Sequence, residues 1–210
     1  MTDRTLGRAG RPRGSSRAML EEAAAELFLE QGYAGTTVEQ VARRAGVSRN
    51  TFFNYFPVKS DLLWVDVDAG LAELPRALKR CPAELSATDA VRQALHEVAA
   101  GFGPGRVPWA LTQAEVMGTR AALEASALSR LMTQSELLSR FVAGRVGAGG
   151  GDAARTALAC RSFAMAVLAA ATAAAGVWAA SGVSRGELAP YVDAGIAPAC
   201  DGYRAALAAG

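Results

Sequence analysis

The residues whose types and spacing best suit a chemical role lie between positions 36 and 59. Arg49, Asn50 and Thr51 directly follow Ser48, a residue type that commonly begins a helix. Arginine can hold guanine through two hydrogen bonds, and asparagine can do the same with adenine. Together they predict a short helix whose first residues contact base edges in the major groove of DNA.

Two short helices must position these side chains. Thr37 followed by Gln40 forms a capping box that begins one helix, and Gly46 ends it. Ser48 begins the next helix, which Pro57 ends because proline has no backbone N–H. Two short helices joined by a turn that contains glycine are typical of a helix-turn-helix.

The sequence TTVEQVARRAGVSRNTFFNYFPVKSDLL, with the preceding AELFLEQGYAGTT, resembles the DNA-binding domain of the TetR family of bacterial regulators. The apolar helix, the glycine stop, the capped helix and the aromatic helix ending in F-P-x-K occur in the family's order. The FFNYF segment and residues 119–147 resemble more weakly the mycofactocin-type TetR regulators. The resemblance implies that further residues contact phosphates or nearby bases: Thr36, Thr37, Ser48, Asn54, Tyr55 and Lys59.

Two residues depart from the family's pattern. Phe53 stands where the family commonly has tyrosine, so a hydroxyl contact to phosphate is missing. Asn50 replaces a small residue, and it either adds base readout or obstructs it. The alternative is a three-helix unit that does not touch DNA. In such a unit Arg49 and Asn50 would be exposed without a role in packing, which argues against this alternative.

A basic arm precedes the first helix. Gly10, Arg11, Pro12 and Arg13 resemble the core of an AT-hook, and Arg17 follows them. Such an arm can enter the minor groove beside the site of a recognition helix. A solvated basic tail is the alternative, and the sequence leaves both open.

Charge and cysteine usage narrow the class of protein. Residues 1–60 contain nine Lys or Arg against six acids, whereas the other 150 residues contain 13 against 14, so basic charge gathers where a nucleic acid would bind. Three distant cysteines and the lack of an apolar signal segment favour a protein of the cytoplasm. We expect no metal and no cofactor. We also expect no enzymatic activity, because no catalytic constellation is visible.

Apolar residues recur at helical spacing over nearly the whole chain of 210 residues. We therefore predict an all-α fold of about nine helices. Its expected parts are a flexible arm (residues 1–14), a DNA-binding domain (15–58) and a ligand-sensing and dimerisation domain (59–210). One helix should continue from about Ser60 past Leu78, and two long helices should cover 120–146 and 152–180.

The expected ligand pocket rests on large apolar residues and the single histidine. Plain core packing is the alternative interpretation for each of them. The candidates are His96, Trp109, Met117, Leu128, Met132, Phe141 and Met165.

The last two helices would form the dimer, as the family resemblance implies. The residues expected near the partner are Phe163, Val167, Ala170, Ala174, Val177 and Trp178. Residues 162–184 contain no charge and are long enough to span a bilayer. Their many alanines and glycines favour close helix packing instead, so we expect no membrane.

The resulting prediction is a homodimeric repressor that binds a palindromic operator in double-stranded DNA and is released by a small molecule. Two other classes remain open. One is a helical protein-interaction module that has lost DNA binding, and the other is a membrane-associated regulator.

Overall fold

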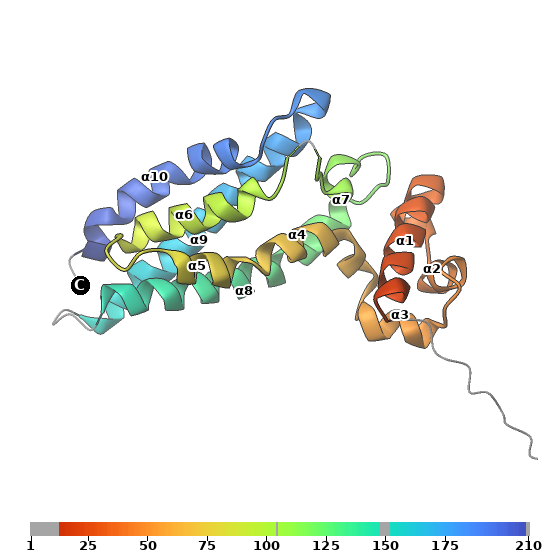
Figure 1. Ribbon diagram of the computed structural model, residues 1–210, viewed down its shortest axis with the longest axis horizontal. Helices are drawn as coiled ribbons and strands as arrows, with labels where there is room; N and C mark the ends of the chain where they lie inside the picture. Colours follow the sequence, from red (N-terminus) through yellow and green to blue (C-terminus); the bar gives the residue numbers. More distant parts are fainter. Residues whose placement is uncertain (1–12, 104, 148–151, 209–210) are drawn as a thin grey trace, which may run out of the picture. The chain divides into compact units, whose positions relative to one another are not determined.

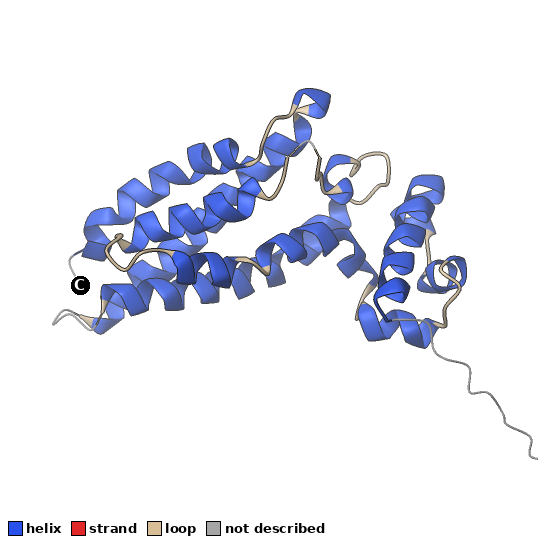
Figure 2. Ribbon diagram, in the orientation of Figure 1, coloured by secondary structure: helices blue, strands red, loops and turns tan. Residues whose placement is uncertain are grey.

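The computed structural model describes residues 13–103, 105–147 and 152–208, and they are predominantly helical (Figures 1 and 2). Within these ranges the backbone forms no β-strand, and Gly103 and Arg106 form an isolated bridge. The prediction of an all-α fold is confirmed. The chain divides into two compact units, one containing the described residues up to Val65 with Glu115–Thr119, and the other the rest.

The first unit consists of α1 (Arg13–Gly35), α2 (Val38–Arg44), α3 (Arg49–Tyr55) and the 3-10 helix η1 (Lys59–Trp64). Large apolar side chains from all four helices are almost fully buried: Leu20, Phe28, Val41, Phe52, Phe56 and Leu62. Because the short helices contribute one or two large residues each, packing rather than local propensity stabilises them.

The sequence correctly placed the signals that begin and end these helices. The Thr37 hydroxyl accepts a hydrogen bond from the Gln40 N–H at 3.2 Å, and the Gln40 side chain accepts from the Thr37 N–H at 2.7 Å. The Ser48 hydroxyl accepts from the Thr51 N–H at 3.0 Å. Gly32 interrupts α1 with a φ of 77°, a conformation that glycine adopts at least cost.

A short segment from later in the sequence completes the first unit. Glu115–Thr119 belongs to it, and the Met117 carbonyl accepts a hydrogen bond of 2.7 Å from the Tyr33 N–H. The Met117 side chain is 1% exposed. The break in α1 at Gly32 frees that N–H from the helix, so the segment supplies a partner that a buried donor needs.

The second unit contains α4 (Val65–Leu71) from its second residue onward, and six further α-helices. They are α5 (Leu74–Arg80), α6 (Ala87–Ala100), α7 (Trp109–Thr112), α8 (Arg120–Val146), α9 (Ala153–Ala180) and α10 (Ala189–Ala208), with the 3-10 helix η2 (Gly182–Ser184). α10 packs on α9 and α6, and α8 packs on α9 (Figure 1). Their shared core includes Leu95, Leu138, Phe163, Trp178 and Ile196.

In the second unit the two longest helices agree with the sequence, whereas one expected helix is wrong. The long helices α8 and α9 have the expected bounds, and Asp152 caps α9. The single helix expected from about Ser60 past Leu78 is wrong, because η1, α4 and α5 occupy that range. Pro75 lies in the first turn of α5 and has no N–H to continue a helix from α4. Pro198 lies inside α10 without ending it.

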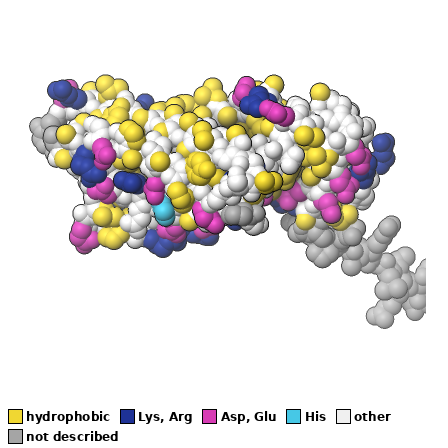
Figure 3. All heavy atoms as spheres, turned by 90° about the horizontal axis from the view of Figure 1, so that it is seen from above, with side chains coloured by type: hydrophobic (Ala, Val, Ile, Leu, Met, Phe, Trp, Pro, Cys, Tyr) yellow, Lys and Arg dark blue, Asp and Glu magenta, His cyan; other side chains and the backbone are white. Residues whose placement is uncertain are grey.

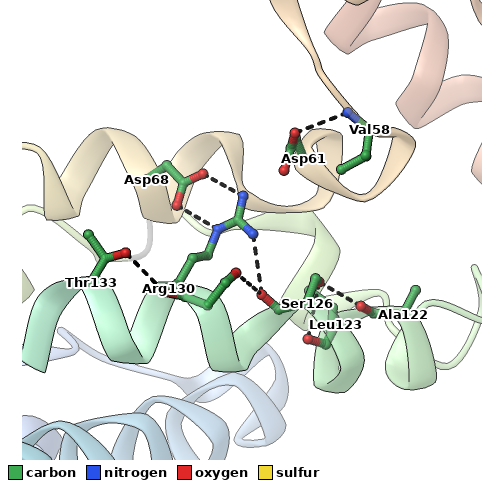
Figure 4. Close-up of polar contacts among 9 residues, drawn as sticks. Val58, Asp61, Asp68, Ala122, Leu123, Ser126, Arg130 and Thr133 are labelled. Carbon is green, nitrogen blue, oxygen red and sulfur yellow. Dashed lines mark hydrogen bonds and ion pairs between the residues drawn. The ribbon is translucent and has the colours of Figure 1, made fainter.

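An ion pair fixes α4 against α8 within the second unit. The Arg130 guanidinium donates from Nε and Nη2 to the two oxygens of Asp68, each at 2.9 Å (Figure 4). The Arg130 side chain is 18% exposed, so solvent screens this pair less than an open surface pair. Two-point geometry of this kind fixes the relative position of the two helices.

By length and composition, α9 is apolar enough to cross a membrane. Phe163, Val167 and Trp178 are buried against the other helices of the second unit.

Candidate nucleic-acid interface

The start of α3 presents polar side chains to solvent. Ser48, Arg49, Asn50 and Asn54 are exposed, while Thr51 is half-buried. The opposite side of the helix is fixed, because Phe52 and Phe56 are buried in the core. Arg49 and Asn50 thus have the exposure that base readout requires.

Three further residues expected to contact DNA belong to α3 or to the N-terminal cap of α2. Thr37 is exposed next to α2, Phe53 is 39% exposed, and Tyr55 is half-buried. Thr37 and Ser48 both act as helix caps, so their hydroxyls already accept backbone hydrogen bonds. A hydroxyl with one accepted bond can still donate to a phosphate oxygen.

Arg49 contacts two neighbours in the first unit. Its Nε lies 2.6 Å from Oε1 of Glu39 on α2. Its guanidinium carbon lies 5.0 Å from the centre of the Phe53 ring, within the range of a cation–π contact. Sequence reasoning missed Glu39, although its position one residue before the end of the capping box is visible in the sequence.

Thr36 does not belong to the exposed surface, so its expected DNA contact needs correction. Its side chain is 1% exposed, and its hydroxyl donates to the Gly32 carbonyl at 2.8 Å while accepting from Gln31 at 3.2 Å. Thr36 closes the end of α1, and its hydroxyl has no direction left toward DNA.

Lys59 also has a structural role that the sequence did not indicate. Its Nζ donates to the carbonyls of Tyr33 and Thr36, each at 2.8 Å, and lies 3.9 Å from the centre of the Tyr33 ring. Burial lowers the pKa of Lys59. Burial also raises the pKa of Tyr33, and the nearby Asp61 carboxylate adds to this shift. The ammonium group thus holds the end of α1 instead of reaching outward to a phosphate.

Two further arginines are held by acidic partners. Arg44 on α2 forms ion pairs with Glu26 at 3.0 Å and Glu30 at 2.8 Å, both on α1. The hydrogen bond from Arg44 holds the pKa of Glu30 below its usual value. Arg17 pairs with Glu21 at 2.8 Å and lies 4.8 Å from the centre of the Phe56 ring. Arg11 and the Arg13 side chain lie outside the described part of the chain.

The residues expected to form a ligand pocket do not come together. Met117 packs into the first unit, whereas Leu128 and Met132 on α8 are 62% and 55% exposed. His96 is on the surface, the cyan side chain of Figure 3, and its Nδ1 lies 2.7 Å from Asp193. Trp109 and Phe141 are half-buried, and Met165 is 36% exposed. The single pocket inferred from these seven residues is therefore corrected.

A cavity of about 630 Å³ lies elsewhere in the second unit, at the connection between α5 and α6. Arg145 in its wall donates to the carbonyls of Cys81, Pro82 and Leu85 at 2.8–2.9 Å. Arg204, also in the wall, pairs with Asp89 at 2.7 Å. Arg145 is thus hydrogen-bonded to backbone carbonyls, and Arg204 is paired with a carboxylate. Among the described residues no group of three His, Cys, Asp or Glu is placed to hold a metal.

Comparison with known proteins identifies both units. Residues 20–63 match the profile described as "Bacterial regulatory proteins, tetR family", and residues 85–204 match the "MftR C-terminal domain". The chain belongs to the TetR family. Its fold is similar to that of a solved structure, the TetR-family transcriptional repressor FadR from Thermus thermophilus in complex with lauroyl-CoA, with a TM-score of 0.54 at 24% identity. That match covers 89% of this chain and 94% of the other.

Two curated relatives in the TetR family are named as transcriptional regulators. MftR of Mycobacterium tuberculosis, named for mycofactocin biosynthesis, is 34% identical over 88 residues, which are 42% of this chain and 44% of the relative. HbdR of an Aromatoleum species is 39% identical over 67 residues, 30% of this chain and 29% of the relative. Each match thus spans less than half of the relative's length.

The TetR resemblance implied a dimer surface on α9, and the structure corrects its residues. Phe163, Val167 and Trp178 are fully buried inside the second unit, and Ala170 and Ala174 are half-buried. Of the six expected residues, Val177 is the exposed one, at 61%. Phe163, Val167 and Trp178 face this chain's own core, so a partner would meet a different face of α9.

Proposed function

We propose that this TetR-family chain is a dimeric transcriptional repressor that binds a roughly palindromic operator. The observation that carries the proposal is the exposure of Arg49 and Asn50 at the start of α3, whose other side the core fixes. A helix held in this way can enter the major groove with its first residues toward the bases. Asn54, one turn later on the exposed side, extends the same surface.

The small-residue face of α9 supports the proposed dimer. We give this name to Ala169, Ala173, Gly176 and Ala180, which are exposed and share one side of the helix. Val177 lies beside them. Small side chains let two helices approach closely, and this face contains no charge that dimerisation would have to desolvate. Burying it against a second copy would remove apolar surface from water.

We further infer that a small molecule releases the repressor from DNA. The FadR structure in complex with lauroyl-CoA supports a ligand for a protein of this fold. A ligand acts this way only if it binds the DNA-free conformation more tightly than the bound one. In this chain the cavity at the connection between α5 and α6 is one place to test, by substituting Ser86 or Thr88 in its wall.

We place the proposed repressor in the cytoplasm, without membrane, cofactor or metal, and without enzymatic activity. The three cysteines are free and buried, which fits a reducing compartment. The named relatives are transcriptional regulators, which favours regulation over catalysis.

The proposal is tested by in vitro selection from random duplex DNA. Wild-type protein should enrich an inverted repeat, and the double variant Arg49→Ala with Asn50→Ala should not. Circular dichroism and sedimentation would verify that both proteins are folded dimers. If a folded, dimeric wild type enriches no sequence at moderate salt, the repressor proposal fails, and a helical protein-interaction module takes its place.

A further inference from the structure

Arg49 is the first residue of α3, and its guanidinium is held from two sides. Glu39 on α2 contacts Nε at 2.6 Å, and the Phe53 ring, one turn along α3, lies 5.0 Å from the guanidinium carbon. The side chains of Arg49 and Glu39 are 61% and 58% exposed. An exposed arginine ordinarily samples many rotamers, and these two contacts restrict that freedom.

The contact with Glu39 leaves the outer end of the guanidinium available. An arginine side chain has five N–H donors in one plane, and Nε supplies one of them. The Nη1 and Nη2 groups supply the other four. Guanine needs two coplanar donors for its O6 and N7 in the major groove. A guanidinium bound through Nε therefore keeps the donors for a two-point contact with guanine.

The aromatic ring of Phe53 offers a planar surface for the Arg49 guanidinium. An aromatic ring attracts a cation placed over its face, and a planar guanidinium also stacks on it. The ring is 39% exposed, although a phenylalanine on a surface usually weakens solubility. The loss of the family's tyrosine hydroxyl at this position leaves intact the part of the side chain that contacts Arg49.

We propose that Glu39 and Phe53 are positioning residues that hold Arg49 ready to recognise a guanine in each operator half-site. This inference rests on the proposed function and names the base that one side chain of that site reads. Prior positioning increases discrimination because less freedom is lost when the two hydrogen bonds form. A carboxylate close to the DNA backbone otherwise only weakens binding, since it repels the phosphates.

A purely electrostatic role for Glu39 predicts a different result. If the carboxylate did no more than neutralise Arg49, its removal would tighten binding to every duplex and steepen the dependence on salt. If the carboxylate positions Arg49, its removal weakens the preference for one base pair. The two roles therefore change different quantities.

The experiment starts from the operator that the wild type selects. Affinities are measured for this operator and for duplexes that replace each base pair in turn. Glu39→Gln and Phe53→Leu should each lower the preference for guanine at the Arg49-dependent base pair by about fivefold, part of what a two-point contact provides. Preferences at the other base pairs should stay unchanged.

Two matched variants serve as controls. Phe53→Tyr keeps the ring and should keep the guanine preference. Glu22→Gln removes the same charge from the exposed surface of α1 and should change all duplexes equally. Circular dichroism of each variant checks the fold, which exposed substitutions of this kind change little.

Several results would overturn the inference while leaving the repressor proposal intact. One is a selected operator in which the base pair that depends on Arg49 is not G·C. Another is an unchanged guanine preference in both Glu39→Gln and Phe53→Leu, or a uniform gain of affinity in Glu39→Gln. A wild type that selects no operator would instead overturn the proposed function, and this inference with it.

Discussion

Helices α3 and α9 differ in how side-chain size relates to exposure. In α3 the polar residues Arg49 and Asn50 face solvent and Phe52 faces the core. From residue 162 onward α9 contains no charged residue; its two aromatic side chains, Phe163 and Trp178, are fully buried, while Ala169, Ala173 and Gly176 are exposed. Polarity predicts the exposed face of a helix when polar and apolar residues alternate. Where polarity gives no such contrast, the aromatic side chains, which have the most area to bury, turn inward.

The largest expected effect tests this difference in α9. Phe163→Ala should lower the free energy of unfolding by about 3–5 kcal/mol, because it empties a fully buried position in the core. The ring also packs 5.6 Å from that of Tyr203, centre to centre. Urea unfolding followed by circular dichroism, at equal protomer concentrations, measures the change.

Ala173→Glu is the matched variant on the small-residue face of α9. It should keep the helical content and turn the proposed dimer into a monomer in sedimentation. The comparison between large and small faces would be broken if Phe163→Ala gave a monomer with normal stability while Ala173→Glu stayed dimeric.

A smaller change in stability tests whether Thr36 belongs to the core of the first unit or to its DNA-binding surface. Thr36→Val should lower the free energy of unfolding by about 1–3 kcal/mol, because the hydroxyl of the buried Thr36 and its hydrogen bond to the part-buried Gly32 carbonyl are lost. Thr36→Ser retains the hydroxyl and should recover much of this loss. Operator affinity, measured below the unfolding temperature, should not change in either variant. A specific loss of operator affinity in Thr36→Val would restore the threonine to the DNA surface.

The smallest effect is a dependence of stability on pH. Burial raises the pKa of the Cys200 thiol from 9.0 to about 11. The unfolded chain therefore loses this proton at a lower pH than the folded chain does. The stability is fully present below about pH 9 and decreases as the pH rises toward 11, by at most about 1.4 kcal/mol for each pH unit.

Urea midpoints between pH 8 and 10.5 would reveal this decrease, and Cys200→Ala should make it shallower. Some slope should remain, since burial also raises the pKa of Cys81 and Cys160. An identical slope in Cys200→Ala would mean that the thiol is less enclosed than its place in α10 indicates.

Local signals explain what the sequence could predict. Ser48 and Asp152 cap their helices through atoms two or three residues away, so their roles are visible in short segments. The family resemblance provided the overall fold and the start of α3 as the place to look.

The missed features depend on partners far apart in the sequence. Lys59 reaches the carbonyls of Tyr33 and Thr36, and Arg44 pairs with Glu26 and Glu30 on another helix. Judged by residue type alone, Lys59 and Arg44 both look like side chains that bind DNA. Only tertiary packing decides that one supports a helix end and the other joins two helices.

The first unit is formed by two separate segments of the sequence, and this limits how it can be transferred to another protein. A fragment that ended at Val65 would lack Met117, and with it the acceptor for the Tyr33 N–H and a buried side chain. A chimera that took only the N-terminal third from this chain would place an unrelated loop where the Met117 carbonyl accepts the hydrogen bond from Tyr33. Chimeric regulators that take their DNA-binding unit from this chain should therefore also include its segment Glu115–Thr119.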